Sequence, residues 1–333
     1  ILNSSKILFI SMLILSTLIT ISSTNWFGMW MGLEMNLMSF IPLIYKSKNK
    51  SPSKAMMIYF LAQSIGSITL LFSILFNSMM FMSTSMVMEI NKMLILVGVF
   101  IKLGASPFHF WLPEMMANLN WNECLIMMTW QKVAPLFMLF NLNSTSNWFY
   151  YTVVMFSSIT GAVGGINQTS LRKMFAYSSI NHMSWMMMMI SACSNWYKYL
   201  IIYSILMIMI CMFLKKKNAL FINQLNSMSF SMTEKLTYTI MMLSIGGLPP
   251  FLGFLPKWMV IQMMIDSEMY FLLMIMMFMS LLTLFYYMRM MTPFILNYTT
   301  MNKWSPTNKI SMMMFMINFI NLTLPLFLIN SFF

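Results

Sequence analysis

The sequence has few charged residues, and this shortage decides the class of protein. Only 8% of its 333 residues are Asp, Glu, Lys or Arg, whereas 59% are hydrophobic. A soluble domain usually has about 25% charged residues. No Gly/Ser-rich linker separates the apolar stretches. The sequence therefore predicts one integral membrane domain, covering residues 1–333, with short loops.

Cysteine is also scarce, and its three copies are far apart. Cys124, Cys193 and Cys211 lack CxxC spacing, so they cannot hold an iron–sulfur cluster by themselves and need not form disulfides. The sequence has no phosphate-binding loop, no nucleophile–base motif and no metal-ligand spacing. We expect no redox centre and no bound cofactor in this chain.

Arginine is almost missing, while methionine is abundant. Arg172 and Arg289 are the only arginines, and 48 residues are Met, which is not normally among the commonest amino acids. Usage rich in Met, Ile, Lys, Asn and Phe is typical of an AT-rich gene in which a second codon is read as Met. It indicates an animal mitochondrial genome. Met as flexible apolar filler is the alternative, but filler does not explain the shortage of arginine.

Apolar runs of about 17–25 residues are long enough to cross a bilayer as helices. They predict an all-α integral membrane protein with about eleven transmembrane helices. The expected spans are 5–24, 26–45, 55–81, 90–111, 123–142, 148–167, 174–192, 197–214, 236–265, 269–293 and 309–331.

The basic residues support this count. Three lysines (Lys102, Lys132 and Lys257) remain inside the spans, and of the other basic residues only Lys92 and Lys198 face one side of the membrane. Fourteen face the other side: Lys6, Lys46, Lys48, Lys50, Lys54, Arg172, Lys173, Lys215, Lys216, Lys217, Lys235, Arg289, Lys303 and Lys309. The positive-inside rule then predicts an N-terminus in the matrix and a C-terminus in the intermembrane space. Because these charges are spread over short loops, the net charge of +12 does not predict nucleic-acid binding.

A short motif occurs twice. Gly104–Pro113 and Gly247–Pro256 both read G-x-x-P-F-x-x-aromatic-L-P, with six of ten positions matched. Pro and Gly interrupt a membrane helix, and such breaks are tolerated where they face protein or trapped water. The motifs fall on the fourth and ninth spans, and this odd offset predicts two inverted five-helix repeats, each with a broken helix. The repeats would cover about 5–142 and 148–293, followed by an extra helix at about 309–331; coincidence is the alternative.

Four ionisable residues lie well within apolar spans: Glu34, Lys102, Lys132 and Lys257. Each costs about 2.5–3.5 kcal/mol at the bilayer centre, and such residues usually mark ion pathways. We therefore expect Glu34 to pair with a buried lysine and the lysines to relay protons. The alternatives are an acid with a purely structural role and lysines that extend to the membrane surface. The second alternative suits Lys257, which follows its break, better than Lys132, which lies mid-span.

Two histidines are further candidates. His182 lies within a span, and histidine titrates near physiological pH, which suits proton relay. A hydrogen-bonded structural histidine is the alternative. His109 lies in the first Gly/Pro motif, nearer an interface, and nothing else in the sequence supports a haem held by the two histidines.

Several segments together resemble a known family. They are Lys102–Glu114 (KLGASPFHFWLPE), Thr129–Pro135 (TWQKVAP), Gly164–Lys173 (GGINQTSLRK) and the stretch around the second Gly/Pro motif. They resemble the antiporter-like membrane subunits of respiratory complex I, in an insect-like mitochondrial form, from Trp26 to Arg289. The animal members of this family lack three N-terminal helices, which agrees with eleven spans.

The resemblance implies a membrane-arm subunit of NADH:ubiquinone oxidoreductase in the mitochondrial inner membrane, which translocates protons while electrons pass to ubiquinone elsewhere in the complex. It implies that Glu34 and Lys102 form the input pair, that Lys132 is the central relay and that Lys257 is the output-side lysine. The implied partners are other membrane-arm subunits, including antiporter-like ones, and membrane lipid. NADH, FMN, iron–sulfur clusters and ubiquinone would serve the whole complex. A free-standing cation/proton antiporter and a structural spacer without a proton path are the alternatives.

Overall fold

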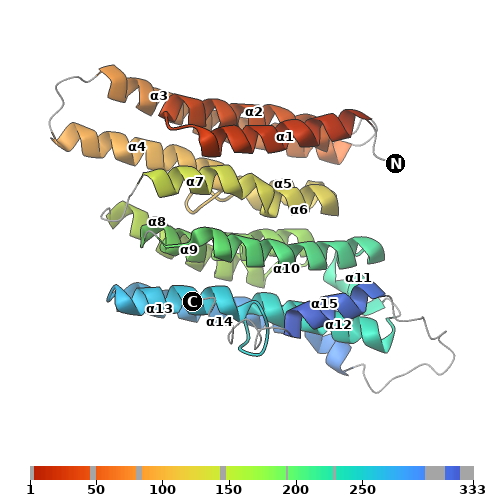
Figure 1. Ribbon diagram of the computed structural model, residues 1–333. Helices are drawn as coiled ribbons and strands as arrows, with labels where there is room; N and C mark the ends of the chain where they lie inside the picture. Colours follow the sequence, from red (N-terminus) through yellow and green to blue (C-terminus); the bar gives the residue numbers. More distant parts are fainter. Residues whose placement is uncertain are drawn as a thin grey trace. The chain divides into compact units, whose positions relative to one another are not determined.

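The computed structural model describes residues 4–45, 50–79, 85–142, 148–192, 194–227, 230–296 and 312–322. Within these ranges the chain is almost entirely helical (Figure 1). Seven of the helices in these ranges are long and apolar enough to cross a membrane. The prediction of an all-α membrane protein is therefore confirmed, while the count of eleven spans stays a prediction. The last expected span, 309–331, lies mostly outside the described residues.

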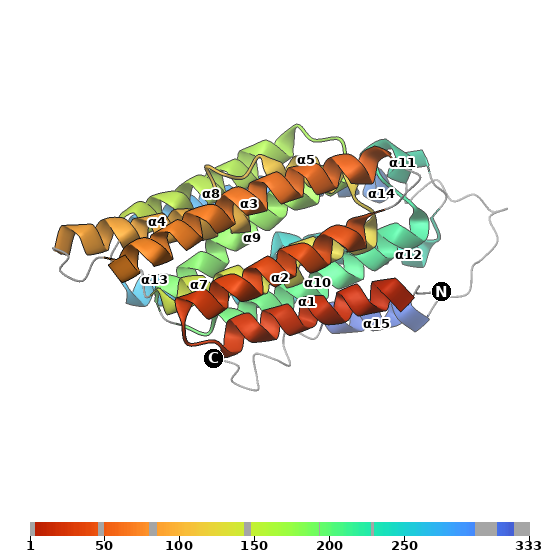
Figure 2. The same cartoon turned by 90° about the horizontal axis from the view of Figure 1, so that it is seen from above.

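The chain forms two compact units, Ile1–Ser157 and Ser158–Phe333, which are described separately. The helices of the first unit are α1 (Ser4–Ser22), α2 (Trp26–Ile44), α3 (Lys50–Met79), α4 (Ser85–Leu103), α5 (Trp111–Asn118), α6 (Trp121–Met128), the 3-10 helix η1 (Trp130–Lys132), α7 (Val133–Asn141) and the start of α8 (Trp148–Ile166). In this unit α2 packs between α1 and α3, and α3 packs against α4 and α5 (Figure 2). The short helix α7 contacts α1, α2 and α4.

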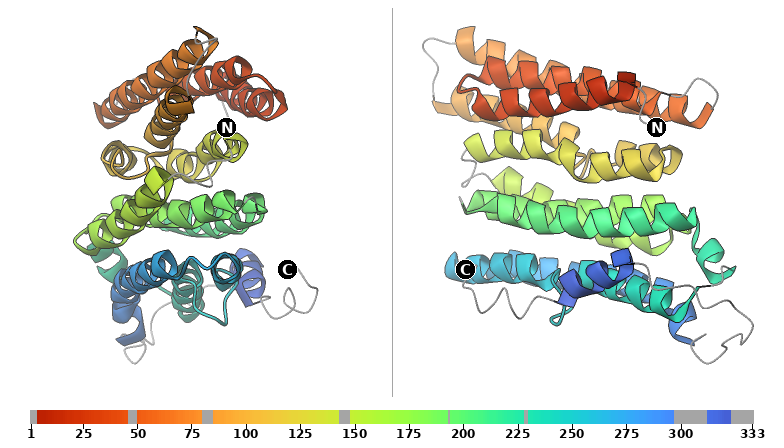
Figure 3. Two further views of the ribbon diagram at one scale, coloured as in Figure 1. Left: turned by 90° about the vertical axis from the view of Figure 1, so that its left-hand side faces the viewer. Right: turned by 45° about the vertical axis from the view of Figure 1, so that its right-hand side comes forward.

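The second unit begins within α8. Its other helices are α9 (Leu171–Ser191), α10 (Trp196–Lys217), α11 (Ile222–Ser227), α12 (Met232–Gly246), α13 (Phe254–Asp266), α14 (Tyr270–Leu296) and α15 (Met312–Leu322). The long helices of each unit run side by side (Figure 3). Helix α9 contacts α10, α13 and α14, and every residue from Ser178 to Ser191 is buried. A helix covered on all sides needs no polar face, so α9 is the core of its unit.

Helix α1 shows the burial pattern expected in lipid. Its buried residues are Leu13, Ser16, Thr17 and Thr20, while most of its larger apolar side chains are exposed. The hydroxyls of Ser16 and Thr20 each donate to a carbonyl one turn earlier, at 2.7 Å. An added Cβ on Gly32 of α2 would collide with Thr20. Small residues therefore bring α1 and α2 close together, as in membrane helix pairs, and the apolar face remains for lipid or other chains.

Two of the expected spans are interrupted at the Gly/Pro motifs. In the expected span 90–111, α4 stops at Leu103 and α5 begins at Trp111. In the expected span 236–265, α12 stops at Gly246 and α13 begins at Phe254. The residue after each first half-helix is a glycine in the left-handed region, with φ +70° at position 104 and +74° at position 247. Glycine adopts this conformation without a steric penalty, and it ends the helix.

The hydrogen bonds after these glycines are also equivalent. Each glycine donates its N–H to the carbonyl three residues earlier, at 3.2 Å in the first motif and 3.0 Å in the second. The next N–H reaches the carbonyl five residues earlier, from Ala105 to Phe100 at 3.1 Å and from Leu248 to Leu243 at 3.3 Å. Both breaks therefore use the same helix-ending motif. The two matched sequences fold alike as well as reading alike.

Two glycines near the second break should respond very differently to alanine. An added Cβ on Gly253 would overlap the carbonyl oxygen of Ser244, whereas on Gly246 the nearest atom would be 3.7 Å away. We expect Gly253→Ala to destabilise the protein by more than about 3 kcal/mol, because backbone must move. Gly246→Ala, the matched control, should be tolerated because alanine favours a helix. Thermal stability of the isolated assembly measures both; equal effects would contradict this packing.

Candidate functional site

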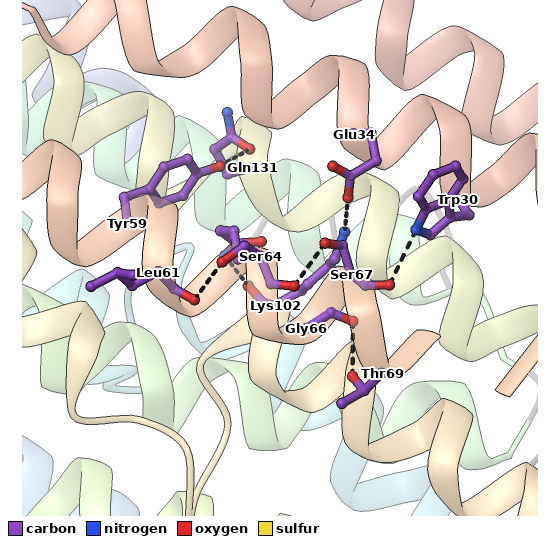
Figure 4. A network of polar contacts seen from close by, with 11 residues as sticks. Trp30, Glu34, Tyr59, Leu61, Ser64, Gly66, Ser67, Thr69, Lys102 and Gln131 are labelled. Atoms are coloured by element: carbon purple, nitrogen blue, oxygen red, sulfur yellow. Dashed lines mark hydrogen bonds and ion pairs between the residues drawn. The ribbon is translucent and has the colours of Figure 1, made fainter. Parts of the chain in front are cut away.

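The first unit brings Glu34 and Lys102 together. Glu34 lies in the middle of α2, and Lys102 lies in the last turn of α4. The Lys102 Nζ is 3.5 Å from the Glu34 Oε1 (Figure 4), and their side chains are 2% and 24% exposed. A lysine this deeply buried needs a compensating oxygen. The carboxylate of Glu34 provides one.

The neighbouring helix α3 fixes the position of Lys102. An added Cβ on Gly66 would lie 3.0 Å from the Lys102 Cγ, so this glycine gives the lysine stem its space. The Lys102 carbonyl, which has no donor in its own helix at the break, accepts a hydrogen bond from Gln63 Nε2 at 3.1 Å. The Ile101 carbonyl likewise accepts from Trp111 Nε1 at 3.1 Å. Side chains thus satisfy the end of the half-helix.

Glu34 also reaches an outer groove. A pocket of about 390 Å³ is lined by Leu8, Phe9, Met12, Met31, Glu34, Met35, Met38 and Ser39. Its walls are α1 and α2, and they are largely apolar. The carboxylate of Glu34 therefore lies between this groove and the buried ammonium of Lys102.

Lys132 lies at a helix break that the sequence reading missed. The stretch Trp121–Asn141 is long and apolar enough to cross a membrane, in agreement with the expected span 123–142. It is not one regular helix, because α6 stops at Met128, η1 follows, and α7 starts at Val133. Pro135 has no N–H, so the carbonyl of Gln131 loses its usual partner in the helix. Thr129 adds to the distortion, because its hydroxyl donates to the Leu125 carbonyl at 2.7 Å. Lys132 is buried, 3% exposed, at the end of this short turn.

Lys257 lies in the second unit and uses a different partner. It follows the second break, in the first turn of α13, and is 5% exposed. Its Nζ donates to the Gly246 carbonyl at 2.8 Å, which is the C-terminal end of α12. The C-terminal end of a helix carries partial negative charge. Both breaks thus place an ammonium at the end of the first half-helix. Lys102 belongs to that half-helix, α4, whereas Lys257 belongs to α13 and its side chain reaches back to the end of α12.

His182 lies in the second unit, in the buried core helix α9. Its Nδ1 is 2.9 Å from the hydroxyl of Tyr199, and its ring lies 4.9 Å from the ring of Tyr203. Both tyrosines are on α10. His109 lies in the first unit, in the break between α4 and α5, and its ring lies 4.3 Å from that of Phe110. The two histidines belong to different units.

A match to a family model shows the class of membrane protein to which the chain belongs. Residues 23–283 match the family model described as NADH:quinone oxidoreductase/Mrp antiporter, transmembrane region. The fold is similar to a chain of respiratory complex I from Thermus thermophilus with bound aureothin. That match has a TM-score of 0.79 at 19% identity and covers 88% of this chain and 71% of the other.

Closer relatives define the family. The chain is 43% identical over 311 residues to NADH-ubiquinone oxidoreductase chain 2 of Locusta migratoria, covering 93% of this chain and 91% of the relative. It is 46% identical over 315 residues to the protein of the same name from Aedes aegypti, covering 92% and 91%. The chain belongs to the NADH-ubiquinone oxidoreductase chain 2 family.

Proposed function

We propose that this chain is a membrane-arm subunit of NADH:ubiquinone oxidoreductase and that it carries protons across the mitochondrial inner membrane. Electron transfer from NADH to ubiquinone would drive it from elsewhere in the complex. The observation that carries the proposal is the buried ion pair of Glu34 and Lys102 at the end of a broken helix. Intramembrane charges are costly and are usually functional.

The pair gives a simple way to release a proton. A buried ammonium is stable only while an oxygen compensates its charge. When Glu34 takes up a proton from the groove side, or moves away, Lys102 loses that compensation and gives its proton onward. Lys132 would accept it as the central relay, and Lys257 would pass it to the output side. His182, bonded to Tyr199 in the core of its unit, is a further candidate relay.

Helix contacts support the proposed inverted repeats. In the first unit α3 contacts α4 and α5, and α7 contacts α1, α2 and α4. With an offset of five spans, α3 corresponds to α10 and α7 corresponds to α14. The equivalent contacts would then be those of α10 with α12 and α13, and those of α14 with α8, α9 and α12. The contacts of α10 and those of α14 with α9 and α12 are present, and Gly165 of α8 packs against Tyr286 of α14. The two five-helix repeats and the extra C-terminal helix would together make about eleven spans.

The proposal also covers the orientation of the protein in the membrane and its partners. The protein would be multi-pass, with its N-terminus in the matrix and its C-terminus in the intermembrane space. Its partners would be other membrane-arm subunits and lipid. NADH, FMN, iron–sulfur clusters and ubiquinone would bind elsewhere in the complex, because no motif for them occurs in this sequence.

A variant of Lys257 tests the proposal. Lys257→Met keeps the length of the side chain but removes the ammonium that bonds to the Gly246 carbonyl. We expect the assembled complex, in sealed vesicles supplied with NADH and quinone, to lose about tenfold or more of its proton-pumping rate, as when a proton-transfer group is removed.

Lys216→Met is the matched control, since Lys216 is exposed in the last turn of α10. Assembled Lys257→Met complex with a normal pumping rate and a normal number of protons per NADH would contradict the proposed route. Cation/proton exchange by the purified chain alone would favour a free-standing antiporter instead.

A further inference from the structure

Two polar side chains of α3 contact the surroundings of Lys102 and of Lys132. Tyr59 and Gln63 are four residues apart on α3, so they lie on the same face of that helix. Gln63 donates to the Lys102 carbonyl at 3.1 Å. The hydroxyl of Tyr59 donates to Gln131 Oε1 at 3.3 Å (Figure 4), and Gln131 directly precedes Lys132. Helix α3 therefore presents one polar group to each lysine's neighbourhood.

The hydroxyl of Tyr59 is not needed to fill space. The residue is 2% exposed, and its ring packs against Phe40 at 5.1 Å and Trp111 at 6.1 Å between centroids. A phenylalanine would make the same ring contacts without the cost of burying a hydroxyl. The hydroxyl of Tyr59 bonds to the side chain that precedes Lys132, and Gln63 on the same face of α3 bonds to the Lys102 carbonyl, so we consider a role for this hydroxyl in linking the surroundings of the two lysines.

Gln131 is suited to hold that hydroxyl. Its Nε2 is buried and has no hydrogen-bond partner among the described residues, while its Oε1 accepts the hydrogen bond from Tyr59. The break at Pro135 fixes the backbone next to it. An amide can accept a hydrogen bond but does not readily pass a proton on, whereas a hydroxyl can accept one proton while releasing its own. Of the two side chains, only Tyr59 can relay.

We propose that Tyr59 passes protons from Lys102 to Lys132 and that Gln131 is the positioning residue that holds the Tyr59 hydroxyl between transfers. In the transfer, one N–H bond of the Lys102 ammonium breaks and a proton reaches the Tyr59 oxygen. The original Tyr59 O–H bond then breaks as its hydrogen turns away from Gln131, and that proton forms a new N–H bond on neutral Lys132. Tyr59 ends neutral, Lys102 ends as an amine, and Lys132 ends as an ammonium. This inference rests on the proposed function.

The test compares Tyr59→Phe with Tyr150→Phe in the assembled complex. Tyr150 is a fully buried tyrosine of the same unit, packed against Phe100 at 5.9 Å. We expect Tyr59→Phe to lower the proton-pumping rate about tenfold or more and to raise the solvent deuterium isotope effect on turnover, because proton transfer becomes limiting. Tyr150→Phe should change neither. The double variant Tyr59→Phe/Lys132→Ala should lose no more than Lys132→Ala alone, because both residues act in one path.

Other results would overturn the inference. A normal pumping rate and isotope effect in Tyr59→Phe, or losses that multiply in the double variant, would remove Tyr59 from the path. If Lys132→Ala still lowered pumping in the same assay, the proposed function would stand and only this inference would fail. Should Tyr59→Phe not assemble, Gln131→Leu replaces it: slower pumping with a raised isotope effect supports the inference, and unchanged values reject it.

Discussion

Replacing Lys132 with arginine should leave the complex assembled and stop proton transfer through this chain. Arginine preserves the positive charge of Lys132, but its guanidinium is not deprotonated in proteins, so it cannot release a proton. Lys132→Ala should also fail, because it removes the relay altogether. We expect either variant to lower protons pumped per NADH, or to slow turnover by at least about 100-fold where transfer through this chain is obligatory.

Proton uptake into sealed vesicles, measured together with NADH oxidation and the amount of assembled complex, separates these effects. Lys216→Arg and Lys216→Ala are the matched controls, since Lys216 is exposed in α10. Lys132 variants that assemble and retain both rate and stoichiometry would remove this residue from the pathway. A charge needed only for packing would be satisfied by arginine, so normal pumping by Lys132→Arg alone would support a structural role.

The pair of Glu34 and Lys102 should behave as one unit. Glu34→Gln leaves the Lys102 ammonium without its 3.5 Å partner, and Lys102→Met leaves the carboxylate of Glu34 without its own. Breaking a fully buried pair costs about 3–5 kcal/mol, and the cost here should be smaller because the Glu34 side chain is 24% exposed. We expect each single variant to lower thermal stability and to abolish most pumping.

The double variant Glu34→Gln/Lys102→Met distinguishes stability from transport. The double variant removes both charges. Its loss of unfolding free energy should therefore be smaller than the sum of the two single losses by about 1 kcal/mol or more, while pumping stays lost. Additive stability losses would show that the two side chains do not interact. Glu34→Gln with an unaltered proton affinity of Lys102, measured from the pH dependence of pumping, would equally reject the pairing.

Much of the fold could be predicted from composition and from two short motifs. The shortage of charge placed the chain in a membrane, and the apolar runs located the long helices. The breaks at positions 104 and 247 followed from glycine and proline in apolar surroundings, because these residues have strong local effects on a helix. Buried charges are so costly in lipid that Glu34 and Lys102 stood out before any contact was known.

Other features depend on tertiary contacts or on weaker local signals. The break before Lys132 had a signal in Pro135, but a single proline within an apolar run does not say whether a helix kinks or stops. Tyr59 and Gln63 had only their polarity and a spacing of four residues in an apolar span. Their partners lie 72 and 39 residues away in the sequence, and such partners cannot be deduced from local patterns.

The most direct test of the proton route is a map of the intact complex at a resolution that shows ordered water. A continuous hydrogen-bonded chain of side chains and waters is expected from Glu34 and Lys102 through Tyr59 to Lys132, and onward to Lys257, in at least one state during turnover. An apolar barrier without water between Lys102 and Lys132 in every state would contradict the account.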